Sequence, residues 1–271
     1  MRAEGQRLVE LYLKLMRFRV ILVSLLCFFS FAQAADLPEC AGDDYEFWTD
    51  CIGVIDSESL NYIGAFGDGK PHGVGLLEDA FGTKYNGQFR HGKKYGQGEM
   101  TFGSEHPLSG STYAGQFKND MPHGKGAMQY DNGAKYEGSY QFGQFHGYGS
   151  MQFVNGDHYR GGYREGQKEG FGIYTYADGA RYEGRWRNDQ EHGRGRQTYS
   201  SGGKYVGNFQ NGAPNGEGVY TFSNGESYKA LWVDGEPLQE TIEILPLDKL
   251  PLTRQLIFRG ATLALLNLAL K

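Results

Sequence analysis

Apolar and polar residues alternate in a pattern that recurs throughout residues 62–232. Tyr113, Gly115 and Phe117, for example, are spaced two apart and are separated by Ala, Gln and other small or polar residues. Because successive side chains of an extended strand point to opposite faces, this alternation predicts a strand whose rings share one face. The same spacing in residues 124–130 predicts a second strand.

The predicted strands are separated by residues typical of tight turns. Asn119-Asp120 offers the first turn. Asn132-Gly133 follows the second strand and predicts a type I′ hairpin turn, in which both central residues have positive φ. Each repeat is therefore predicted to be a β-hairpin, and consecutive hairpins would give an antiparallel meander of about 15 strands.

The pattern returns at a nearly constant interval. Its lead tyrosines are Tyr62, Tyr85, Tyr113, Tyr136, Tyr159, Tyr182, Tyr205 and Tyr228. All intervals are 23 residues except the one containing residues 103–110, which are turn-forming in composition. A fixed period of this length indicates a repeat array. We therefore expect an all-β fold, an elongated single-sheet meander of consecutive β-hairpin repeats.

The chain has 42 glycines, and in the repeats they share faces with large aromatic side chains. Glycine normally weakens a strand. A residue without a Cβ, however, lets a neighbouring ring lie flat across the backbone. We therefore predict ladders of rings packed over glycines, with hydrophobic burial distributed along the sheet.

The repeat pattern Tyr-x-Gly-x-aromatic-x-x-Gly/Asp-x-x-His-Gly-x-Gly, clearest in residues 113–126, 136–149 and 182–195, resembles the MORN (membrane occupation and recognition nexus) repeat. The resemblance extends over residues 62–235 as about seven and a half repeats. Its histidine is replaced at Tyr95, Glu169 and Asn215. Such arrays occur in scaffold proteins, membrane-junction proteins, and beside lipid-kinase and methyltransferase domains, so the resemblance implies the fold and leaves the function open.

Residues 1–34 predict export. A basic segment precedes the apolar run at residues 20–31, and Ala32-Gln33-Ala34 provides a small-x-small cleavage site. We expect a short signal helix that is cleaved after Ala34, with translation starting at Met16, and a periplasmic or secreted protein with some membrane association. The alternative is an uncleaved membrane anchor, but the run is shorter than the ~20 residues that a span needs.

Residues 35–61 are acidic. They hold eight Asp and Glu and no Lys or Arg. Cys40 and Cys51 lie in this segment, and an even pair in an exported protein predicts a disulfide that fastens the segment and helps to cover the first edge strand. A redox pair, a metal site or a Ca²⁺ site formed by the carboxylates are the alternatives, but the spacing matches none of their motifs.

The charge balance argues against nucleic-acid binding. The chain has 27 Lys and Arg against 32 Asp and Glu, and no basic stripe that could neutralise phosphates. Equivalent histidines such as His123 and His146 would lie ~9–10 Å apart, one hairpin from the next. Two ligands of one zinc must each lie ~2 Å from the ion. We therefore expect no metal site, and histidine rings that pack beside glycine.

No catalytic motif emerges from the sequence. Gly-x-Ser-x-Gly elbows are absent, and the Gly-x-Gly pairs precede strands rather than the helix N-termini that bind phosphate. We expect no catalytic residues, no cofactor and no enzymatic activity.

Residues 236–271 depart from the repeat pattern. Pro237, Pro246 and Pro251 punctuate a linker, and residues 256–270 predict an apolar helix. The helix either caps the last edge of the sheet, because repeat arrays need terminal caps, or lies in a membrane surface as an anchor. We expect the cap.

Our main hypothesis is a non-catalytic binding or scaffold protein of the cell envelope that engages a protein or glycan partner. Cationic side chains in residues 159–204 would attract an anionic partner, and exposed rings could stack on glycan or peptide, although most rings are expected to belong to the ladder. An ordinary mixed-charge surface is the alternative interpretation. The candidate partner-binding residues are Arg160, Arg164, Arg181, Arg185, Arg187, Arg194, Tyr140, Tyr163 and Trp186.

The resemblance implies two further functions. One is a protein that binds or tethers membrane phospholipid through the repeats and residues 256–271. The other is an accessory subunit of a lipid kinase or hydrolase. Its only support is that such repeats occur beside enzyme domains in other proteins.

Overall fold

The computed structural model describes residues 37–245, and these are all-β apart from two single-turn 3-10 helices. Contacts between residues divide the chain into two units. The first comprises residues 1–154 and 164–166, and the second residues 155–163 and 167–271. The predicted signal peptide and the predicted C-terminal helix lie outside the described residues.

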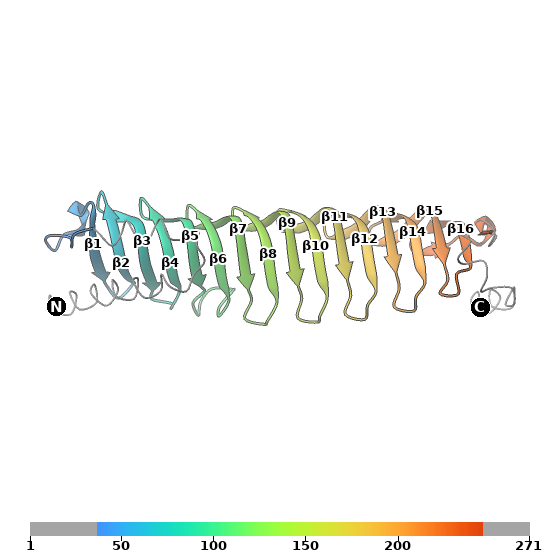
Figure 1. Ribbon diagram of the computed structural model, residues 1–271, viewed down its shortest axis with the longest axis horizontal. Coiled ribbons are helices and arrows are strands. Elements are labelled where there is room, and N and C mark those ends of the chain that lie inside the picture. The colour runs from blue at the N-terminus through green and yellow to red at the C-terminus, as the bar shows by residue number, and fades with distance from the viewer. Residues whose placement is uncertain (1–36, 246–271) are drawn as a thin grey trace. The chain divides into compact units, whose positions relative to one another are not determined.

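The first unit begins with a 3-10 turn, η1 (Tyr45–Phe47), and continues as a layer of antiparallel strands, each paired with the next (Figure 1). Its strands are β1 (Cys51–Asp56), β2 (Leu60–Gly67), β3 (Lys70–Asp79), β4 (Lys84–Arg90), β5 (Lys93–Thr101), β6 (Thr112–Lys118), β7 (Met121–Gln129), β8 (Lys135–Gln141) and β9 (Gln144–Gln152). This succession confirms the predicted hairpins.

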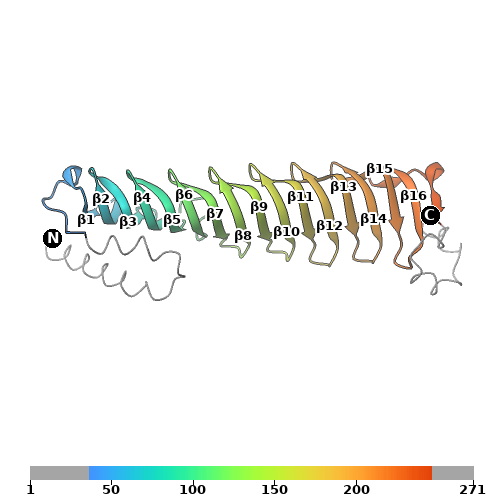
Figure 2. The same ribbon diagram turned by 45° about the horizontal axis from the view of Figure 1, so that its top comes forward.

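The second unit repeats this arrangement, with tight turns at both ends of its strands (Figure 2). Its strands are β10 (His158–Arg164), β11 (Gln167–Thr175), β12 (Arg181–Arg187), β13 (Gln190–Thr198), β14 (Lys204–Gln210), β15 (Ala213–Thr221), β16 (Ser227–Val233), β17 (Glu236–Pro237) and β18 (Glu243–Leu245), with η2 (Gln239–Thr241) before the last. From β11 to β16 each strand pairs antiparallel with the next.

A ladder of rings forms the core of each unit. The lead tyrosines from Tyr62 to Tyr205 are at most 1% exposed. In the first unit Tyr85 packs edge-to-face against Phe89 and Phe117, each at 5.0 Å between ring centroids. In the second, Tyr182 packs in the same way against Trp186 (5.2 Å). Edge-to-face pairs add attraction beyond the buried area, so each hairpin is held to the next by its rings.

The lead tyrosines from Tyr62 to Tyr205 each donate a hydrogen bond from the hydroxyl to the backbone carbonyl three residues further on. Tyr113 Oη donates to the carbonyl of Gln116 (2.9 Å), and Tyr182 Oη to that of Arg185 (2.8 Å). The strand register shifts at these places, which interrupts the regular ladder. Burial raises the pKa of the phenols, that of Tyr205 to about 12, so they remain donors.

Glycines make room for these rings, as predicted. A Cβ on Gly115 would lie 2.6 Å from Tyr113 Oη, and one on Gly184 would lie 2.5 Å from Tyr182 Oη and 2.6 Å from the Cα of Gly195. Carbon atoms do not approach other heavy atoms this closely, so only glycine fits at these positions.

The turn at Asn132-Gly133 is not the predicted type I′ turn. Tyr130 N donates to Ala134 O (2.9 Å), Gly133 N donates to Tyr130 O (3.0 Å), and only Gly133 has positive φ (93°). This is a three-residue loop in which a type I turn is followed by a left-handed glycine. Asn132 does not enter the left-handed region, because its Oδ1 accepts from Ala134 N (3.0 Å) instead. Two consecutive positive φ values occur at the other turn, at Asn119 (50°) and Asp120 (70°).

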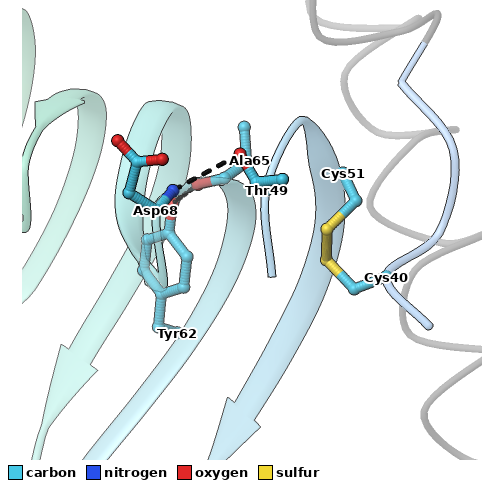
Figure 3. The surroundings of a disulfide bond; sticks show 6 residues. All are labelled: Cys40, Thr49, Cys51, Tyr62, Ala65 and Asp68. Carbon is cyan, nitrogen blue, oxygen red and sulfur yellow. Dashed lines mark hydrogen bonds between the residues drawn. A yellow bond between two sulfur atoms is a disulfide. The ribbon is translucent and has the colours of Figure 1, made fainter. Parts of the chain in front are cut away.

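The predicted disulfide is confirmed. Cys40 and Cys51 are bonded, with their Cα atoms 4.9 Å apart (Figure 3). Beside the bond, Cys40 N donates to Ile52 O (2.9 Å) and Ile52 N to Pro38 O (2.8 Å), so residues 38–40 cover part of the free edge of β1.

Residues 236–245 cover the other edge, that of β16. β17 and β18 both pair with β16, and Leu231 N donates to Thr241 Oγ1 (2.9 Å). The sequence predicted only a linker here and assigned the cap to residues 256–271. A segment that follows the last repeat directly is close enough to fold back along that strand.

Candidate functional site

The three rings expected to be exposed are buried. Tyr140 is 3% exposed, Tyr163 7% and Trp186 5%. All three stand four residues after a lead tyrosine and so point to the same face of the strand. Each packs edge-to-face on its lead tyrosine at 5.2 Å. As surfaces for stacking on a partner these residues were predicted wrongly, because they belong to the ring ladder.

The arginines on β12 and β13 form one exposed surface on the opposite face. Because Trp186 points into the ladder, its neighbours Arg185 and Arg187 point away from it. We call the surface the basic face; it consists of Arg181, Arg185, Arg187, Arg194 and Arg196, all exposed.

Few carboxylates neutralise the basic face. Arg181 pairs with Glu183 at 3.2 Å, and both side chains remain partly exposed, so this pair is worth little. Arg185, Arg187, Arg194 and Arg196 form no ion pair with any residue from 37 to 245. The face therefore carries several cationic groups that can take anions from outside.

The structure does not bring all the predicted arginines together. Arg160 is exposed on β10, in the second unit. Arg164 is also exposed but belongs to the first unit, and it is not a member of the basic face. Lys168 is a further basic residue of this part of the chain. It lies on the opposite face of the strands, which carries the ladder of rings and which we call the ring face. Its Nζ is 4.4 Å from the centroid of Trp186 and 4.9 Å from that of Tyr174.

Lys168 and four further residues form a polar cluster on the ring face that the sequence did not predict. Tyr174 Oη donates to Asp157 Oδ2 at 2.6 Å, and this bond holds the pKa of Asp157 below its usual value. Burial lowers the pKa of Lys168, and the rings around its ammonium stabilise the charged form through cation–π attraction.

Glu191 and Tyr176 complete the ring-face cluster. Burial raises the pKa of Glu191 to about 7, and Tyr176 Oη lies 3.5 Å from its Oε1. At the repeat position of Glu191, several other repeats hold uncharged residues such as Pro122 and Phe145. A charged residue at this position was therefore the sequence signal that could have indicated the cluster. Because the charged groups are already engaged by neighbouring rings and hydroxyls, the cluster contributes mainly to packing.

No group of three or more His, Cys, Asp or Glu in residues 37–245 is placed to hold a metal ion. His72 packs beside Gly67, in the manner expected, and its ring lies 5.2 Å from that of His91. Within the same residues, no helix has the length and apolarity needed to cross a bilayer.

Comparison with known families identifies the repeats. The MORN repeat profile matches residues 62–80, 85–105, 113–135, 136–158, 159–181, 182–204 and 205–227, which is more than half of the chain. The chain therefore belongs to the MORN repeat family, as its sequence pattern predicted.

Several solved structures are distantly similar. One is the wild-type TCP10 domain of Danio rerio CPAP in complex with a peptide of Danio rerio STIL (10% identity, TM-score 0.39, covering 66% of this chain and 78% of that chain). Another is the G-box domain of the microcephaly protein CPAP (9%, 0.42, 72% and 98%). A third is the SAS-4 TCP domain with a proline-rich motif of Ana2 of Drosophila melanogaster (12%, 0.29, 55% and 83%). Likeness at this level carries no information on function. None of the curated proteins compared with the chain matches it.

Proposed function

We propose that this chain is a non-catalytic scaffold of the cell envelope that binds an acidic segment of a protein partner on its basic face. The observation that carries the proposal is the set of arginines on β12 and β13 that lack carboxylate partners among the described residues. A guanidinium presents paired donors that match a carboxylate, so neighbouring arginines favour Asp- or Glu-rich peptide.

A protein partner is favoured over the alternatives. Tyr140, Tyr163 and Trp186 were expected to stack on glycan or peptide, and their burial removes that contact for both. A peptide can still bind through its carboxylates, for which the arginines supply the donors. A phospholipid surface would also meet Glu183, which pairs with Arg181, and other acidic groups of a chain of net charge −5, whereas a short acidic peptide can contact the arginines alone. The placement in the cell envelope rests on the predicted signal peptide.

The test is a titration of the full chain with a fluorescently labelled oligo-glutamate peptide, followed by anisotropy. Reversing Arg185→Glu and Arg187→Glu should weaken binding about tenfold or more, since each like-charge contact opposes the peptide. Binding of the unchanged chain should also weaken as salt is added.

The first unit offers a matched control. Gln116 and Lys118 stand at the same repeat positions as Arg185 and Arg187, so Gln116→Glu with Lys118→Glu adds similar charge elsewhere. This control should lose less than about threefold through long-range repulsion alone. Equal losses in both variants would show that only net charge matters. Flotation with phosphatidylserine vesicles but no peptide binding would replace the protein partner by a membrane.

A further inference from the structure

The acidic N-terminal segment of the first unit is exposed and is attached to the neighbouring strands at two places. We call residues 37–50 the acidic cap; it contains Glu39, Asp43, Asp44, Glu46 and Asp50, all exposed, and no Lys or Arg. None of these carboxylates forms an ion pair with a residue that the structure describes. The cap is fixed at one end by the disulfide and at the other by Gly69 N, which donates to Trp48 O (2.8 Å).

Two aromatic side chains of the acidic cap, Tyr45 and Phe47, are exposed among these carboxylates. Trp48 turns inward and packs on Phe66 at 4.9 Å, which extends the ring ladder by one member. Phe47 stays 81% exposed and Tyr45 47% exposed. An exposed aromatic side chain with a charged rim has the composition of a protein-binding hot spot.

The basic face is complementary to the acidic cap in its charge and in its exposed apolar side chains. Phe171 pairs in register with Arg185, and Val206 with Arg196, so apolar and cationic side chains alternate across the surface. Phe171 is 60% exposed and Val206 49%. A partner that brings carboxylates together with an aromatic ring would engage both kinds of side chain.

We infer that the acidic cap of one copy of this chain docks on the basic face of a second copy. The inference rests on the proposed function and names one partner for the same site. Because two different surfaces meet, the contact is head-to-tail, and copies can add in succession as a ring or filament. Opposite charges steer the encounter, and the exposed rings provide the apolar area that such a contact buries.

The experiment is sedimentation velocity of the full chain over a range of concentrations at low and high salt. We expect the average mass to rise with concentration at low salt and to fall when salt is added. The face variant Arg185→Glu/Arg187→Glu and the cap variant Asp43→Asn/Glu46→Gln should each remain monomeric. An equimolar mixture of the two should form a heterodimer that does not grow, since each variant keeps one intact surface.

A third variant separates specific docking from general charge attraction. Phe47→Ala leaves the charge unchanged and should weaken self-association about tenfold. A chain that is monomeric at every concentration, association that survives in both charge variants, or a mixture that stays monomeric would overturn the inference.

The inference and the proposed function can fail separately, because one is tested by self-association and the other by peptide binding. The cap variant should bind the oligo-glutamate peptide as well as the unchanged chain does. Peptide binding without self-association would overturn only the inference that copies of the chain dock on one another. Peptide binding that persists in the face variant would overturn the proposed function as well.

Discussion

The two units carry the same ladder of tyrosines but flank it with different side chains. Fifteen residues after the lead tyrosine, the first unit has Leu77, Met100 and Met128, whereas the second has Tyr174, Gln197 and Tyr220. The tyrosine hydroxyls and the glycine slots are the same in both. The hairpins therefore depend on the ladder of rings, and the residues fifteen positions after each lead tyrosine can change without loss of the fold.

The opposite faces of the two units differ in the same way. Gln88 and Gln116 of the first unit each accept a backbone N–H at 2.9 Å, from Gln97 and Lys125 respectively. The equivalent residues of the second unit are Gly162, Arg185 and Asn208, and the guanidinium of Arg185 has no acceptor and cannot make this bond. These two repeat positions thus vary while the tyrosine ladder does not, and at Arg185 the variation places an exposed cationic side chain in the second unit.

The glycine slots should show the largest effect, and it should be equal in the two units. Gly115→Ala and Gly184→Ala each force a Cβ against a tyrosine, and overpacking of this kind costs about 3 kcal/mol of the free energy of unfolding. Urea denaturation measures it. Ala114→Gly, on the exposed face of the same strand, is the control and should cost only about 1 kcal/mol. A clear inequality between the two slots would mean that the units do not share one scaffold.

Loss of the disulfide should affect only the first unit. Cys40→Ser with Cys51→Ser opens a loop with a sequence separation of 11. We expect a loss of roughly 2–3 kcal/mol from the loop-entropy relation. Hydrogen exchange should accelerate in β1 and β2 and remain unchanged from β11 to β16. Acceleration in the second unit would contradict this independence.

Glu191 should give the second unit a pH dependence that the first lacks. Its folded pKa, about 7, exceeds the unfolded value, so the folded state binds a proton between these values and stability rises as the pH falls from about 8 to 5. Glu191→Gln should stabilise the chain by about 1–2 kcal/mol at pH 8 and remove this rise. Denaturation at pH 8 and pH 5 tests this, and an unaltered profile in the variant would contradict it.

The tyrosine hydroxyls should have the smallest effect. Tyr113→Phe and Tyr182→Phe each leave a bulge carbonyl without its donor, at a cost of about 1 kcal/mol. Thermal unfolding is sensitive enough to compare them. A neutral result in either variant would indicate that water replaces the hydroxyl.

Much of the scaffold followed from the sequence, because period and alternation are local properties. The hairpins and the glycine slots were predicted from spacing and residue type, and the Cys40–Cys51 bond from an even pair of cysteines in a chain expected to be exported. The same alternation placed Trp186 on the face of Tyr182, so its burial was available from the pattern and was missed.

Other features depend on contacts that spacing does not encode. The turn at Asn132 is decided by a side-chain oxygen that accepts from Ala134 N. The position of Lys168 is decided by Trp186 and Tyr174, rings of neighbouring strands. The cap on β16 is formed by residues 236–245, which carry no repeat pattern.

We propose that binding is concentrated on the basic face of the second unit although both units share the same scaffold. An oligo-glutamate peptide that carries a photo-crosslinker, added to the full chain and mapped by mass spectrometry, tests it most directly. The account predicts crosslinks to residues 181–198, which are lost at high salt and in Arg185→Glu/Arg187→Glu. Crosslinks concentrated on residues 112–129 of the first unit, or spread evenly over both units, would contradict it.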